Sequence, residues 1–171
     1  TLLYNAVDPD LGVIHPVTVD VLRRASAQAK KQGCSLLMIR LNTPGGFADA
    51  TRQAVEVLVA SEPPVVAYVA PSGGRAASAG FWLLEAADVA AMAPGTNTGA
   101  ATPVLLAGQP DEVMKRKIEN DAAASIRSLA DRRVLADDVF QLKRGYPLAA
   151  GFNHILDPVG DLQVSFGIDI A

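Results

Sequence analysis

Ser78 is the residue of this sequence best placed to act as a nucleophile. It lies in segment 71–80 (PSGGRAASAG), between a β-branched run at 65–69 and an apolar, helix-compatible stretch. A hydroxyl where a strand hands over to a helix has unpaired N–H groups and the positive helix end beside it, which favours a developing negative charge. A serine in such a turn can equally be an ordinary helix N-cap. Segment 71–80 alone therefore leaves catalysis and capping open.

A pair of glycines provides candidate donors for an oxyanion hole. Gly45 and Gly46 end the sequence LNTPGG, directly after an apolar run that we expect to be a strand. Ligands bind at the strand ends of an open α/β sheet, and glycines let backbone N–H groups come close to them. If this turn lies beside Ser78, the N–H of Gly45 or Gly46 and that of Ala79 would hold the oxyanion, at about 3 kcal/mol per donor. The alternative is an ordinary type II turn.

A base for Ser78 is harder to find in the sequence. Only two histidines are present, His15 before a proline and His154 in the irregular C-terminal part, and neither is flanked by a catalytic pattern. A lysine amine can serve instead where burial lowers its pKa from about 10.4 towards neutrality. Lys117 borders the apolar stripe of a long predicted helix and is the best-placed lysine. Its alternative role is an exposed ion pair with Asp121, one helical turn further on.

The periodicity of apolar residues predicts strands and helices in alternation, with an irregular segment at 94–109. We expect strands at 2–7, 36–41, 65–70 and 88–93, and helices at 18–32, 48–60, 76–86 and 111–133. Alternating strands and helices of this kind form an α/β fold with a mostly parallel sheet and right-handed crossovers. The predicted architecture therefore brings several strand ends to one edge of a sheet.

Composition narrows the classes of function. The 171 residues are 50% hydrophobic and 19% charged, with a net charge of −3, which indicates one globular domain and argues against a nucleic-acid surface. The single cysteine, Cys34, excludes an intrachain disulfide and a cysteine-rich metal site, and we expect it to be a small buried hydrophobe. No apolar run is long enough to span a bilayer and no signal peptide is visible at Thr1. We expect a soluble domain excised from something longer.

Four ordered motifs together resemble one protein family. They are segments 42–46 (NTPGG), 71–80 (PSGGRAASAG), 93–103 (APGTNTGAATP) and 117–130 (KIENDAAASIRSLA). This series resembles the NfeD-type membrane-associated serine proteases, the stomatin operon partner proteins, whose catalytic domain is Clp-protease-like. The resemblance covers about residues 1–133 and implies a Clp-protease/crotonase-like βαβ spiral, a mostly parallel sheet flanked by helices.

The resemblance also implies a mechanism and partners. Ser78 would be the nucleophile and Lys117 the general base and then acid, with Gly45, Gly46 and Ala79 holding the oxyanion. No metal or organic cofactor is implied. Apolar segments of stomatin-like membrane proteins would be the substrate, and three aromatic residues become candidates for the walls of the substrate site: Phe47, Phe81 and Trp82. The family further implies a homodimer or larger homo-oligomer, anchored to a membrane with the protease domain outside the cytoplasm.

The C-terminal part departs from the family pattern. Residues 134–171 lack the signals that normally follow the lysine helix, so we divide the chain into a catalytic core at 1–133 and an atypical segment of the same domain at 134–171. Two other functions stay open. A non-cleaving module could hold a stomatin-like partner in the same groove, and a crotonase-type acyl-CoA enzyme would share the spiral and the glycine-based oxyanion hole.

Overall fold

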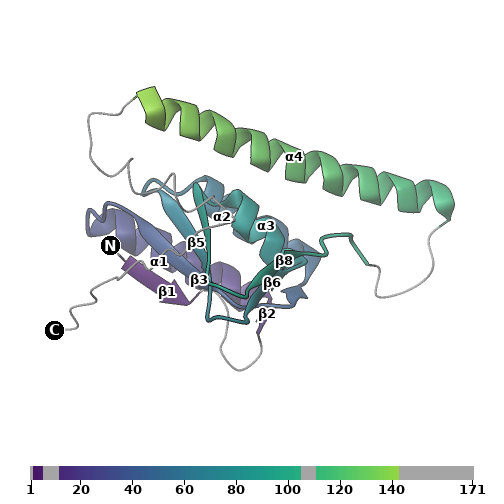
Figure 1. The fold of residues 1–171 in the computed structure, drawn as a ribbon, viewed down its shortest axis with the longest axis horizontal. Helices are drawn as coiled ribbons and strands as arrows, with labels where there is room; N and C mark the ends of the chain where they lie inside the picture. The colour runs from purple at the N-terminus through teal and green to yellow at the C-terminus, as the bar shows by residue number, and fades with distance from the viewer. Residues whose placement is uncertain (1, 6–11, 105–110, 143–171) are drawn as a thin grey trace. The chain divides into compact units, whose positions relative to one another are not determined.

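A four-stranded parallel sheet forms the centre of the fold. The computed structural model describes residues 2–5, 12–104 and 111–142, with side chains from 12 to 104 and from 111 to 132. The strands of this sheet are β1 (Leu2–Asn5), β3 (Leu37–Leu41), β5 (Val65–Val69) and β7 (Val89–Met92). They lie in the order β1-β3-β5-β7, and every neighbouring pair is parallel (Figure 1). The α/β class and the parallel sheet predicted from the sequence are confirmed.

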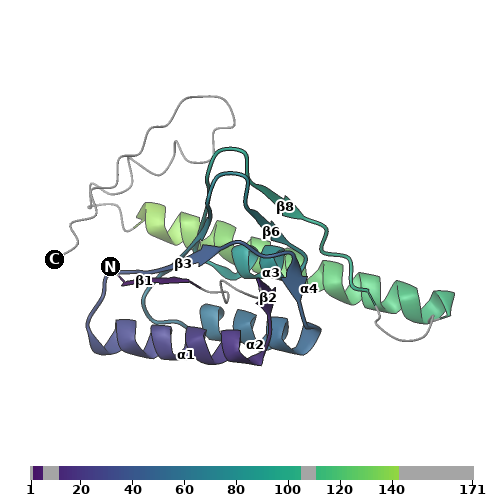
Figure 2. The ribbon, with the colours of Figure 1, turned by 90° about the horizontal axis from the view of Figure 1, so that it is seen from below.

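Two helices cover one face of this sheet. They are α1 (Pro16–Lys31) and α2 (Ala48–Val59), which lie side by side along it in Figure 2. The start of α1 is fixed by a capping box: His15 Nδ1 accepts from the Val17 N–H, and Thr18 Oγ1 accepts from the His15 N–H. Pro16 at the first helical position adds a backbone already restricted to helical φ. His15 thus has a structural role at the start of α1, in keeping with the absence of a catalytic pattern around it.

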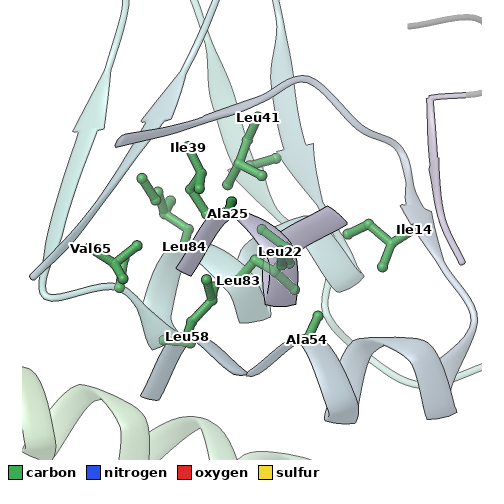
Figure 3. Packing of buried hydrophobic residues seen from close by; sticks show 14 of the residues in the cluster. Ile14, Leu22, Ala25, Ile39, Leu41, Ala54, Leu58, Val65, Leu83 and Leu84 are labelled. Carbon is green, nitrogen blue, oxygen red and sulfur yellow. The ribbon is translucent and has the colours of Figure 1, made fainter. Parts of the chain in front are cut away.

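The core lies between this sheet and the helices. Figure 3 shows Leu22 of α1 and Leu58 of α2 packed with Ile39 and Leu41 of β3. All four are buried, and each contributes roughly 1.5–3 kcal/mol by leaving water. Four of the five residues of β5 are buried, as is usual for a central strand of a parallel sheet. Cys34, half-buried, packs against the edge of this cluster rather than within it.

Two small parallel sheets stand beside the main one and carry the short segments that form the candidate site. One pairs β2 (Val13–Ile14) with β4 (Gly45–Gly46), and the other pairs β6 (Arg75–Ala77) with β8 (Asn97–Gly99). After β6 the chain enters α3 (Ala79–Ala86), which packs against α2, β4, β5, β6 and β8. Strand ends, a glycine turn and a helix start therefore meet at one place.

The sequence prediction is wrong for two segments here. The helix predicted at 76–86 begins only at Ala79, because the two preceding alanines belong to β6. Alanine favours a helix locally, but hydrogen bonds to segments distant in sequence override that preference: the Ala77 N–H donates to the Thr43 carbonyl, and β6 pairs with β8. The segment predicted as irregular, 94–109, contains β8 for the same reason.

The last described element is the long helix α4 (Glu112–Leu142). Residues Thr1–Ala136 form one compact unit and Asp137–Ala171 a second, so that α4 begins in the first unit and ends in the second. Within the first unit, α4 is joined to the core by an ion pair from Arg52 of α2 to Asp121, and by Arg132, which pairs with Asp88 and donates to the Ala86 carbonyl. Residues 143–171, including His154, lie outside the described residues.

Candidate active site

The strand-to-helix turn holds Ser78 in an unusual backbone conformation. Its φ is +52° and its ψ is −117°, in a region that residues with a side chain adopt rarely and at a cost of order 1–3 kcal/mol. The turn is fixed on both sides. The Ser78 N–H donates to the Gly99 carbonyl at 2.8 Å, and the Ser78 carbonyl accepts from the Phe81 N–H at 3.0 Å. The surrounding strands and helix thus impose a strained turn on this one serine.

The Ser78 hydroxyl does not cap the helix. Ser78 occupies the N-cap position of α3, yet its side chain makes no capping hydrogen bond. Phe81 and Trp82 donate their N–H groups to the Ser78 carbonyl, whereas Ala79 and Gly80 precede the first intrahelical bond and have N–H groups available for a ligand. The sequence left capping and catalysis open as roles for Ser78, and its side chain does not cap the helix. The hydroxyl, half-exposed at the start of a helix, is available for chemistry.

The glycine pair lies directly against this serine. A Cβ built on Gly45 would lie 2.8 Å from Ser78 Cβ and 3.2 Å from Ser78 Oγ, and Gly45 has a φ of +132° that only glycine adopts readily. A Cβ on Gly46 would come within 2.1 Å of the Ile14 carbonyl oxygen, which shows how tightly β4 packs on β2. The two turns that the sequence singled out are neighbours in space.

The N–H groups of the two glycines are not equivalent. The Gly45 N–H donates to Thr43 Oγ1 at 3.1 Å and is therefore occupied. The Phe47 N–H donates to the Ile14 carbonyl of β2. Because consecutive N–H groups of a strand point to opposite sides, the Gly46 N–H is directed away from β2. Gly46 and Ala79 thus hold the better-placed donors, and Gly45 supplies close approach.

Three aromatic residues surround this junction to different degrees. Phe47 follows Gly46 directly and is 54% exposed, which is unusual for a large apolar side chain. Phe81 and Trp82 lie in the first turn of α3 and are half-buried. Phe47 thus presents an exposed apolar side chain next to the candidate oxyanion turn.

Lys117 is placed differently from the other candidates. It lies in the first turns of α4 with an exposed side chain, and within residues 12–104 and 111–132 its amine makes no hydrogen bond to Ser78. Its alternative partner, Asp121, pairs instead with Arg52 at 3.3 Å. The described residues therefore bring Gly45, Gly46, Ser78 and Ala79 together and leave Lys117 on a separate helix.

Two residues that the sequence analysis did not single out take part in this geometry. Thr43 holds Gly45, and the Gly99 carbonyl holds the Ser78 N–H. A threonine just before a Pro-Gly turn is a known turn signal and could have identified the first, whereas the second depends on the pairing of β6 with β8. In the part of the chain that the structure describes, no cluster of three His, Cys, Asp or Glu residues could hold a metal ion.

The chain belongs to the family described as NfeD1b, N-terminal domain, whose model matches residues 13–133. Among curated proteins it is similar to the membrane-bound protease PH1510 of Pyrococcus horikoshii, with 39% identity over 121 residues. That match covers 70% of this chain and 27% of the relative, so the chain spans about a quarter of that protein's length. Within the described residues, no helix is long and apolar enough to cross a membrane.

Solved structures of one relative share the fold. A serine-to-alanine variant of the 1510-N membrane-bound stomatin-specific protease superposes with a TM-score of 0.64 and 34% identity, over 73% of this chain and 63% of that one. A lysine-to-alanine variant of the same protease, in complex with a substrate peptide, gives a TM-score of 0.62 and 34% identity, over 74% and 60%. The fold class is therefore Clp-protease-like, as the motifs implied.

Proposed function

We propose that this domain is a serine endopeptidase in which Ser78 attacks the scissile carbonyl of a peptide. The observation that carries the proposal is the geometry of Ser78: a strained turn holds a half-buried serine with an uncapped hydroxyl at the start of α3, directly against the backbone of Gly45. In the described part of the chain, Ser78 and Ala100 are the two residues other than glycine with a positive φ, and such strain at a serine supports a functional constraint, since a structural turn would use glycine there. Relatives that are named proteases and share this fold support the assignment.

The oxyanion would be held by two backbone donors. As Oγ bonds to the carbonyl carbon, the carbonyl oxygen gains negative charge between the N–H of Gly46 and that of Ala79, at the positive end of α3. The tetrahedral intermediate then expels the amine of the leaving peptide and leaves an acyl-serine, which water hydrolyses in a second step. Gly45 contributes space, because any side chain at that position would meet Ser78.

We assign the proton transfers to Lys117. Its neutral amine would take the Ser78 proton during attack and give it to the leaving nitrogen, and then activate the hydrolytic water. The competent state must bring Lys117 beside Ser78, because proton transfer needs the two groups within hydrogen-bond reach. Binding of the peptide over the junction would bring them together. A relative whose structure holds a substrate peptide carries an alanine in place of a lysine, which supports a lysine near the chemistry.

The substrate is an apolar peptide segment of a stomatin-like membrane protein. Phe47, Phe81 and Trp82 would form apolar walls for it, with the exposed Phe47 making the first contact. The name of the solved relative, a stomatin-specific protease, supports this substrate class. We further propose that the domain works as a homodimer and is tethered to a membrane through parts of the protein outside these residues, with the catalytic domain on the extracytoplasmic side.

Labelling with a fluorophosphonate tests the proposal, because the probe reacts with an activated serine. Labelling should occur at Ser78 and disappear in Ser78→Ala, together with cleavage of an apolar peptide from a stomatin-like protein. Ser72→Ala, in an exposed turn a few residues earlier, is the matched control and should retain both. Peptide binding without labelling or cleavage would replace the protease with a non-cleaving module, and detectable coenzyme A binding would favour acyl-CoA chemistry.

A further inference from the structure

Thr43 contacts each of the three parts of the candidate site: the glycine turn at Gly45, the strand β6 that leads to Ser78, and the first turn of α3. It lies between β3 and β4 and is 1% exposed. Its side-chain hydroxyl makes two hydrogen bonds to one residue: Oγ1 accepts from the Gly45 N–H at 3.1 Å and donates to the Gly45 carbonyl at 3.0 Å. Both backbone groups of Gly45 are thereby fixed by a single side chain.

The backbone and methyl group of Thr43 contact the other two parts. Its N–H donates to the Arg75 carbonyl at 2.7 Å, and its carbonyl accepts from the Ala77 N–H at 3.0 Å, so Thr43 is bonded to both ends of β6, the strand that ends at Ser78. A Cβ built on Gly80 would lie only 2.5 Å from Thr43 Cγ2, so the threonine methyl group packs against the first turn of α3. The glycine turn, the nucleophile strand and the helix start all meet on this residue.

We propose that Thr43 is a positioning residue that sets the distance between the oxyanion donors and Ser78. This inference rests on the proposed function. Gly45 has a φ of +132° and, as a glycine, many other accessible conformations. Without a local hydrogen-bond partner its backbone would therefore not be held in this conformation. The Thr43 hydroxyl removes that freedom, and the methyl group packs against the first turn of α3. Thr43 touches no substrate and acts only through the orientation of Gly46 and Ala79.

Replacement of Thr43 by valine keeps the shape and removes the hydroxyl. In Thr43→Val we expect kcat for peptide cleavage to fall by about 10²-fold, because a displacement of about 1 Å at the reacting centre has that effect, while KM changes little. Thr43→Ser restores the hydroxyl without the methyl group and should recover most of the lost kcat. The rate of fluorophosphonate labelling should follow the same order, since the probe also develops charge in the oxyanion hole.

Thr18→Val is the matched control. Thr18 is 3% exposed, and its Oγ1 also accepts one backbone N–H, from His15, in the capping box of α1. This variant should lower the melting temperature and leave kcat unchanged. If Thr43→Val fails to fold, Thr43→Cys compared with Thr43→Ser asks the same question, because the thiol has a similar size and forms much weaker hydrogen bonds.

The outcomes separate this inference from the function on which it rests. Parent protein that neither cleaves nor labels overturns the proposed function itself. Active parent protein together with a Thr43→Val variant of unchanged kcat overturns the positioning role alone. A fall in kcat that Thr43→Ser does not recover, or that Thr18→Val shares in proportion to its lost stability, also overturns it, since both would indicate a general structural effect.

Discussion

Ser78 and Lys117 belong to regions that are held in place by different kinds of contact. Around Ser78, backbone hydrogen bonds come from Gly99 of β8 and Phe81 of α3, and the backbone of Gly45 in β4 packs directly against the serine. Lys117 lies on a helix whose first ten residues are largely exposed and whose described polar links to the core come from Arg52 and Arg132. The side of the proposed nucleophile is therefore preorganised, whereas the proposed base, Lys117, would have to be brought into place.

One of the two largest effects should come from filling the space between the glycine turn and Ser78. Gly45→Ala places a Cβ against Ser78 and adds strain at a φ of +132°. We expect cleavage to fall by more than about 100-fold because the two sides of the junction must separate. Gly73→Ala is the control: it adds an alanine at a φ of +78° with nothing within 4 Å, so it should lose stability only. Gly45→Ala with parental activity would show that the serine side is not preorganised.

Removal of the proposed base should cost activity without stability. Lys117→Ala should lower kcat by roughly 10²–10⁴-fold, as general-base catalysis is lost, with an unchanged melting temperature since the side chain is exposed. Lys115→Ala, on the same exposed stretch of α4, is the control and should leave both quantities unchanged. If Lys117→Ala and Lys115→Ala had equal kcat values, another residue would transfer the proton and Lys117 would not be the base.

Arg132 attaches α4 to the core, and its replacement should weaken that attachment. This half-buried side chain pairs with Asp88 at 3.3 Å and also donates to the Ala86 carbonyl at the end of α3. Arg132→Ala should lower the free energy of unfolding by roughly 1–3 kcal/mol, and amide hydrogens of α4 should exchange faster. Arg127→Ala, exposed on the same helix, should have no comparable effect on urea unfolding. An unchanged exchange rate would mean that α4 does not depend on this contact.

The smallest effect belongs to the pair between Arg52 and Asp121. Its side chains are 71% and 67% exposed, so Arg52→Ala should change the free energy of unfolding by no more than about 0.5 kcal/mol. The difference between variant and parent should shrink in high salt, because exposed charges are screened. A loss several times larger would mean that α4 is held far more firmly than its exposure indicates.

Local sequence patterns sufficed for most of the elements and for one half of the site. The helix predicted at 18–32 follows from a regular apolar stripe, although it begins two residues earlier, at Pro16, and β3 and β5 follow from apolar runs bounded by turns. Ser78 was recognisable because small residues surround it between a strand and a helix. The short strands β2, β4, β6 and β8 were not, since two or three residues carry no periodicity and depend on their partners.

The amino-acid sequence by itself determined the α/β class, the parallel sheet and the identity of the nucleophile candidate, because those follow from periodicity and from residue types over short distances. Only the tertiary structure decided that Gly45 faces Ser78, that the Gly45 N–H is already taken by Thr43, and that two alanines before Ser78 form a strand. The first and the last of these facts depend on packing and hydrogen bonds between segments tens of residues apart, and the Thr43 bond, although local, depends on a turn conformation that the sequence pattern does not specify.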